Sequence, residues 1–263
     1  VVAESRYLAE DAVEKIIIDT EPLPPLVDPE KSAADKAPLV HDDMTSNVLA
    51  IREFTRGDVD GAMESAHLRV GGRFRFHRIS PTAMENRAYL AEYSRADRSL
   101  TLHSTTQVPG IIRDALVQIL GMKGNKLRVI APDVGGGFGG KTSLYPEEFL
   151  VCALSRHLRK PVKWAGDRVE DLMSTSQAFD EIIDAELALD ADGNMLALRA
   201  DVIGDSGAYS IYPWTAVIEP VQVVSFLPGP YRLENYHARV RAVATNKPTS
   251  GPFRGVGRPI STF

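Results

Sequence analysis

The sequence has a single cysteine, Cys152, among its 263 residues. One thiol cannot form an internal disulfide, so a disulfide-stapled secreted scaffold is excluded, and a reducing, cytoplasmic setting is expected. Long apolar runs are also missing, and no stretch approaches the roughly 20 residues of a membrane-spanning helix. Basic charge is not in excess, because the net charge is -5. We therefore expect neither a membrane span nor a nucleic-acid-binding surface.

Apolar residues make up 44% and charged residues 25% of the chain, a balance that supports a globular core. The chain begins with Val1 and shows no signal peptide, and we interpret it as a piece of a longer protein. A helix at 4–15 and a strand at 16–18 are predicted to end a preceding α/β domain at 1–20. Repeated prolines predict a linker at 21–48. The main domain is expected at 49–263.

Within the main domain, apolar alternation predicts strands that are grouped into hairpins rather than into a regular βαβ order. The Gly71-Gly72 pair predicts a bulge in one of these strands. The expected fold class is α+β, with mixed sheets and flanking helices. Strands are predicted at 51–54, 67–78, 89–93, 99–104, 127–131, 162–164, 180–188, 195–203 and 238–244, and helices at 110–120 and 147–158.

The most distinctive segment is a cluster of glycines around Phe138, from Gly135 to Thr142. Glycines are costly in chain entropy, so such a cluster indicates a close backbone approach or positive φ angles. The segment matches G-x-x-x-x-G-K-[ST], the phosphate-binding loop of nucleotide-binding proteins. Pro146 would fall inside the helix that such a loop begins, which argues against that reading. A nucleotide-phosphate-binding module and a purely structural turn are the alternatives at this point.

Two further segments carry polar groups suited to ligand binding. Gly251–Pro259 places Arg254 and Arg258 among glycines, and arginine is a natural bidentate partner of phosphate. Thr105–Pro109 places Gln107 between a predicted strand and a predicted helix, and its side chain can both donate and accept hydrogen bonds. Together with the glycine cluster, these turns predict a large, polar, anionic ligand.

These segments resemble the large subunit of the molybdenum hydroxylases, the family of xanthine dehydrogenase, aldehyde oxidase and carbon monoxide dehydrogenase. The resemblance lies in Ser104–Pro109, in Val129–Val134 leading into the glycine cluster, and in Phe253–Pro259. Pro81–Tyr93 is similar to a further family segment. The resemblance implies that 49–263 is the N-terminal, incomplete part of a molybdopterin-binding domain.

The resemblance also implies a cofactor and a role for each matching residue. The cofactor is molybdenum on a molybdopterin dithiolene, in bacteria as the cytosine dinucleotide. Gln107 matches a glutamine that hydrogen-bonds a molybdenum oxygen, and Gly137, Phe138 and Gly139 match a turn whose backbone amides face the oxo group. Arg254 matches the arginine beside the dithiolene. Gln107 and Phe138 are thus the expected catalytic residues, and no side chain is expected to bind the metal.

The implied reaction oxidises an aldehyde, an N-heterocycle or a similar electrophilic C–H substrate with water as the oxygen source. Electrons then leave through 2Fe-2S clusters to FAD on partner subunits or domains, and the catalytic glutamate lies beyond Phe263 in the remainder of the large subunit.

Thr142 and Val256 replace the Glu and the aromatic residue often found in the purine-oxidising branch. The segment 253–258 lacks the cysteine loop of the carbon monoxide branch. The remaining alternative for the function of the chain is a scaffold that binds no cofactor.

Overall fold

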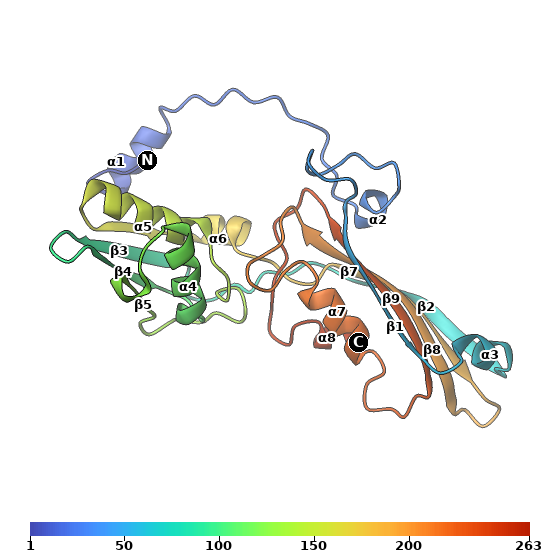
Figure 1. The fold of residues 1–263 in the computed structure, drawn as a ribbon. Coiled ribbons are helices and arrows are strands. Elements are labelled where there is room, and N and C mark those ends of the chain that lie inside the picture. Colours follow the sequence, from blue (N-terminus) through green and yellow to red (C-terminus); the bar gives the residue numbers. More distant parts are fainter.

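The polypeptide forms two lobes, each built on its own β-sheet (Figure 1). The structure is a computed structural model that describes all of residues 1–263. The small lobe is inserted into the large one, because the chain leaves the large sheet after β2 (Leu68–Phe76) and returns to it at β7 (Glu181–Leu189). The antiparallel bridge between Ile79 and Ala178 joins the two connecting segments. This insertion brings loops of both lobes together at the centre of the molecule.

The large lobe contains a five-stranded sheet in the order β1-β9-β8-β7-β2. Only β8 and β9 run parallel, and all other neighbours are antiparallel. Apolar residues such as Val202, Val223 and Val240 are buried between this sheet and the helices that cover it. The other elements of this lobe are α2 (Pro29–Ser32), β1 (Val48–Arg56), α3 (Val59–Glu64), β8 (Met195–Gly207), α7 (Ile218–Phe226), β9 (Asn235–Ala244) and α8 (Arg258–Ser261).

The small lobe contains a four-stranded sheet in the order β5-β4-β3-β6, in which β4 and β5 are parallel. Its core, with Leu100, Leu102, Ile112 and Leu116, lies between the sheet and two helices, α4 and α5. Its elements are β3 (Ala88–Ser94), β4 (Ser99–Ser104), α4 (Pro109–Ile119), η1 (Gly124–Lys126), β5 (Leu127–Ile130), α5 (Pro146–Leu158), β6 (Val162–Ala165) and α6 (Arg168–Ser174), with α1 (Arg6–Val13) beside it.

The expected class, α+β with mixed sheets and flanking helices, is confirmed, and every strand predicted after residue 48 is present. The strand predicted at 16–18 is wrong: the segment is irregular and Ile17 is 93% exposed, because no sheet edge lies beside it. The predicted bulge at Gly71-Gly72 is also wrong. β2 pairs with β7 in continuous register, and Gly71 is needed because a Cβ there would lie 2.5 Å from the Ala185 carbonyl oxygen.

The segment predicted as a linker makes specific contacts with the large lobe from Leu26 onward. Leu26 N donates to Asn246 Oδ1 at 2.8 Å, and Ser32 Oγ donates to the Ala244 carbonyl at 2.6 Å. Pro29 begins the short helix α2, where its missing N–H costs no hydrogen bond. The boundary at 21–48 stays a prediction. No helix of the chain has both the length and the apolar character that crossing a bilayer requires.

The buried core of the small lobe provides a test of the architecture. Leu102 on β4 is fully buried, whereas Leu68 on β2 is 51% exposed. We expect Leu102→Ala to lower the free energy of unfolding by about 2–5 kcal/mol, because it leaves a cavity. The matched control Leu68→Ala is expected to cost less than about 1 kcal/mol. Urea unfolding of both variants measures the difference, and equal losses would contradict this packing.

Candidate functional site

The glycine cluster forms a tight turn between β5 and α5. Gly136 and Gly139 have φ angles of +100° and +104°, and Phe138 has a φ angle of +52°. A non-glycine residue with positive φ costs on the order of 1 kcal/mol, so the surrounding structure must hold Phe138 in place. No protein atom accepts a hydrogen bond from the Phe138 backbone N–H. This N–H is therefore available to a ligand.

Gln107 lies between β4 and α4 and is held against the glycine turn by two hydrogen bonds. Its backbone N–H donates to the Lys141 carbonyl at 2.9 Å, and its side-chain Oε1 accepts the Gly139 N–H at 3.0 Å. The side-chain nitrogen of Gln107 has no partner within the chain, and the residue is exposed. The amide of Gly139 is thus occupied, while Gln107 keeps a donor that is free for a ligand.

Neighbouring groups approach Gly137 and Gly139 so closely that a side chain at Gly137 would displace Gln107 and one at Gly139 would clash with backbone. A Cβ at Gly137 would lie 2.4 Å from Gln107 Oε1. A Cβ at Gly139 would lie 2.2 Å from the Pro252 carbonyl oxygen and 2.9 Å from Phe253 Cα. The glycine turn of the small lobe is therefore in contact with the turn of the large lobe that carries Arg254.

Arg254 occupies a second turn of unusual backbone geometry. Gly255, Val256 and Gly257 follow it with φ angles of +96°, +46° and +72°. Arg254 is exposed, and its guanidinium makes neither a hydrogen bond nor an ion pair. The structure thus gathers all the predicted site residues, namely Gln107, Gly137, Phe138, Gly139 and Arg254, where the two lobes meet.

A buried carboxylate on α7 anchors the Arg254 turn. Glu219 is 1% exposed, and its two oxygens accept the Phe179 N–H at 2.8 Å and the Phe253 N–H at 3.3 Å. Burial raises the pKa of Glu219 to about 7. Sequence reasoning missed this residue, because Phe179 and Phe253 lie 40 and 34 residues away from it in the chain.

Trp214 is a second contact that sequence reasoning missed. Its indole N–H donates to the Thr142 carbonyl at 3.0 Å and so ties the large lobe to the end of the glycine turn. No motif spacing connects Trp214 with Thr142, so the sequence alone does not reveal this contact.

The phosphate-loop interpretation of 135–142 requires a free lysine ammonium and a helix that begins within the motif. Lys141 is instead 4% exposed, and its Nζ pairs with Glu85 Oε2 at 3.0 Å. The helix α5 begins only at Pro146, after the motif has ended. The local geometry therefore argues against a triphosphate cradle.

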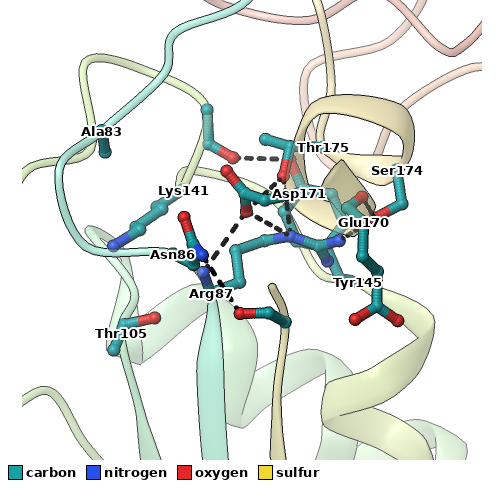
Figure 2. Close-up of polar contacts among 12 residues, drawn as sticks. Ala83, Asn86, Arg87, Thr105, Lys141, Tyr145, Glu170, Asp171, Ser174 and Thr175 are labelled. Atoms are coloured by element: carbon teal, nitrogen blue, oxygen red, sulfur yellow. Dashed lines mark hydrogen bonds and ion pairs between the residues drawn. The ribbon is translucent and has the colours of Figure 1, made fainter. Parts of the chain in front are cut away.

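The base of the site in the small lobe is organised around Arg87. Figure 2 shows this side chain surrounded by Asp171, Ser174 and Thr175. Its Nε donates to Thr175 Oγ1 at 2.8 Å, and its Nη1 pairs with Glu147 Oε2 at 3.0 Å. The guanidinium also lies 4.0 Å from the centre of the Tyr145 ring. Arg87 thus joins the first turn of α5 to the end of α6.

Tyr145 connects this base to the glycine turn. Its hydroxyl donates to the Gly140 carbonyl at 2.5 Å and accepts the Ser176 N–H at 3.0 Å. Glu148 accepts the Tyr145 N–H and the Ser104 hydroxyl, and burial raises the pKa of this carboxyl to about 7. Glu148 therefore closes the start of α5, as its position in the first turn predicts.

The available donors define what the site can bind. The Phe138 amide, the Gln107 side-chain nitrogen and the Arg254 guanidinium all lack protein acceptors. No group of three His, Cys, Asp or Glu side chains lies close enough together to hold a metal ion. The arrangement therefore suits a ligand that presents anionic or electron-rich oxygen atoms.

Comparison with known families identifies the class of this domain. Residues 40–263 match the family described as molybdopterin cofactor-binding domain. The chain belongs to this family and is of the molybdenum hydroxylase large-subunit type, which confirms the resemblance in the sequence.

Individual relatives support the same assignment. The chain is 35% identical over its full length to the nicotine 6-hydroxylase large subunit of Paenarthrobacter nicotinovorans, of which it covers 32%. It is also 35% identical, over 95% of its length, to the carbon monoxide dehydrogenase large chain of Afipia carboxidovorans, again covering 32%. The chain thus spans about a third of the length of these relatives.

A solved structure shows the same fold. Quinoline 2-oxidoreductase from Pseudomonas putida 86 matches 97% of this chain with a TM-score of 0.92 and 36% identity, over 32% of its own chain. The chain is therefore similar to one part of a larger protein, and the two-lobe arrangement is common to both.

Arg87 provides a test of the base of the site. We expect Arg87→Met to lower the free energy of unfolding by about 3–5 kcal/mol, because it leaves the buried Asp171 and the Glu147 carboxylate without their cation. The matched control Arg95→Met changes an exposed arginine in the β3–β4 turn and is expected to have an effect within about 0.5 kcal/mol. Denaturant titration compares the two, and a similar small effect for both would refute the role of Arg87.

Proposed function

We propose that this chain forms one wall of the molybdenum cofactor site in a multi-subunit hydroxylase. The complete enzyme would oxidise an electrophilic C–H substrate, such as an aldehyde or an N-heterocycle, with water as the oxygen source. The observation that carries this proposal is that three partnerless donors, from Gln107, Phe138 and Arg254, lie on turns that come together where the lobes are in contact. The family match supplies the identity of the ligand.

The residues present fit such a cofactor. No three His, Cys, Asp or Glu side chains lie close enough to hold a metal ion themselves, and glycines at 137 and 139 let Gln107 and the Pro252 carbonyl pack directly against the turn that presents the Phe138 amide. When bound, the cofactor supplies a redox-active molybdenum that accepts two electrons from the substrate. Gln107, Gly137, Phe138, Gly139 and Arg254 would hold it. The dithiolene would supply the sulfur ligands, so the chain would need only to position and orient the group.

Each donor has a distinct role in this proposal. The Phe138 backbone N–H and the Gln107 side-chain nitrogen would donate to oxygen atoms of the bound group, and the Gly139 N–H fixes the Gln107 side chain. Donors that are already fixed stabilise developing negative charge without reorganising. The Arg254 guanidinium would bind the anionic part of the cofactor, since arginine presents a planar fork of donors.

The finer parts of the proposal are the cofactor form, the substrate and the partners. We propose the cytosine dinucleotide form of molybdopterin, with 2Fe-2S clusters and FAD on partner subunits. Relatives named as a large chain and as subunit gamma of a dehydrogenase complex support a multi-subunit enzyme. Relatives named for nicotine and quinoline, together with Thr142 and Val256, favour a pyridine-type N-heterocycle over a purine.

Gln107 tests the catalytic part of the proposal. In the complete enzyme, Gln107→Ala is expected to lower kcat about 100-fold to 1,000-fold, because one fixed donor to the reacting oxygen is lost. Molybdenum content is expected to change less. The control Gln118→Ala alters an exposed glutamine on α4 and should leave both quantities unchanged. Normal turnover of a fully loaded Gln107→Ala enzyme would rule out this role.

The glycines test the binding part. Gly139→Ala should abolish molybdenum loading, because its Cβ would meet the Pro252 carbonyl oxygen at 2.2 Å and its φ is +104°. Gly193→Ala is the matched control, since Gly193 has a φ of +82° but no atom within 4 Å of the added Cβ. Metal analysis of the purified enzymes separates them. Equal loading in both would contradict the proposed site, and absence of molybdenum from the unaltered, correctly matured enzyme would favour a cofactor-free scaffold.

A further inference from the structure

A single carboxylate oxygen connects the two ends of the glycine turn. Glu85 Oε2 accepts the Gly135 N–H at 2.7 Å and pairs with Lys141 Nζ at 3.0 Å. The Glu85 backbone N–H also donates to the Gly135 carbonyl at 3.1 Å. Phe138 lies between the two connected residues, so Glu85 closes the loop that presents the Phe138 amide.

Lys141 extends this connection to Gln107. Its carbonyl accepts the Gln107 backbone N–H at 2.9 Å and the Thr106 hydroxyl at 3.2 Å. Gln107 in turn accepts the Gly139 N–H through its side chain. The contacts therefore form a closed ring that runs from Gly135 through Glu85, Lys141 and Gln107 to Gly139.

The ion pair within this ring is buried on its lysine side. The Lys141 side chain is 4% exposed and Glu85 is its only carboxylate partner, whereas the Glu85 side chain is 35% exposed. Figure 2 shows Lys141 beside the segment that carries Ala83, Asn86 and Arg87. A buried ammonium without a partner is strongly unfavourable, so Glu85 fixes the position of the Lys141 side chain.

We propose that Glu85 and Lys141 are positioning residues, which set the Gln107 side chain and the Phe138 amide at the spacing that the cofactor requires. This inference rests on the proposed function of Gln107 and Phe138. Neither Glu85 nor Lys141 contacts the substrate or binds a phosphate. The lysine of the apparent phosphate-loop motif serves instead to shape the turn.

The test uses the complete enzyme with Glu85→Gln, Lys141→Met and the double variant, and Glu234→Gln as an exposed control. Three quantities are measured: the melting temperature, the amide exchange of residues 135–141, and kcat with KM. Glu85→Gln leaves a buried lysine unpaired and should lower the melting temperature. The double variant removes that charge, so its melting temperature should recover toward that of the unaltered enzyme.

The double variant distinguishes a positioning role of Glu85 and Lys141 from a role in stability alone, because the two roles predict different kcat values for it. Positioning predicts that kcat stays low, by about 10-fold to 100-fold, with faster amide exchange at 135–141 even after the melting temperature recovers. KM should remain within about twofold, because the substrate does not contact either residue. Recovery of kcat together with the melting temperature would overturn the proposal.

The outcome for Gln107→Ala separates this proposal from the proposed function. If Gln107→Ala lowers kcat while the double variant turns over normally, the positioning role is overturned and the proposed function stands. If Gln107→Ala itself has no effect, the proposed function fails. The change in amide exchange tests the Glu85–Lys141 connection independently in either case. Normal exchange at 135–141 in Lys141→Met would show that this ion pair does not hold the glycine turn in place.

Discussion

The contact between Gly139 and the Pro252 carbonyl is the constraint on which the rest of the site depends. The backbones approach so closely that a Cβ at Gly139 would lie 2.2 Å from that oxygen. This approach joins a turn of the inserted lobe to a turn of the lobe that surrounds it. Because Arg254 lies just beyond Pro252, the same contact sets the position of the Arg254 backbone relative to Gln107 and Phe138.

Buried polar groups below the surface hold both turns in this arrangement. Tyr145, whose ring packs against the Arg87 guanidinium, fixes the glycine turn from the small lobe, while Glu219 fixes the Arg254 turn from the large lobe. Each of these groups satisfies backbone or side-chain partners that would otherwise be buried without hydrogen bonds. The donors at Gln107, Phe138 and Arg254, by contrast, lie at the surface of the site and have no partner within the chain.

Much of this architecture could be predicted from residue patterns. Apolar alternation located the strands, and the glycine cluster indicated close backbone approach, which the crowding at Gly137 and Gly139 confirms. The short helices α3 and α6 and the apolar helix α7 were not predicted, because they are defined by tertiary packing more than by local periodicity. Glu219 and Trp214 were missed because their partners lie 34 to 72 residues away in the chain.

The residue patterns also led to two wrong structural predictions, the strand at 16–18 and the bulge at Gly71-Gly72, and to one ambiguous motif. Gly71 indicated a bulge, whereas it allows β7 to approach β2 within a regular ladder. The phosphate-loop match at 135–142 could not be decided from spacing, because only the structure shows the Lys141 ammonium buried against Glu85. Sequence reveals where glycine is required, but the identity of the approaching group depends on the tertiary fold.

The most direct test of the central claim is to locate molybdenum in crystals of the complete enzyme by anomalous scattering at the molybdenum absorption edge. The account predicts a single peak in front of the glycine turn, facing the Phe138 amide and the Gln107 side chain, with Arg254 beside the bound cofactor. A peak elsewhere in the enzyme, with these three donors facing only solvent, would contradict it.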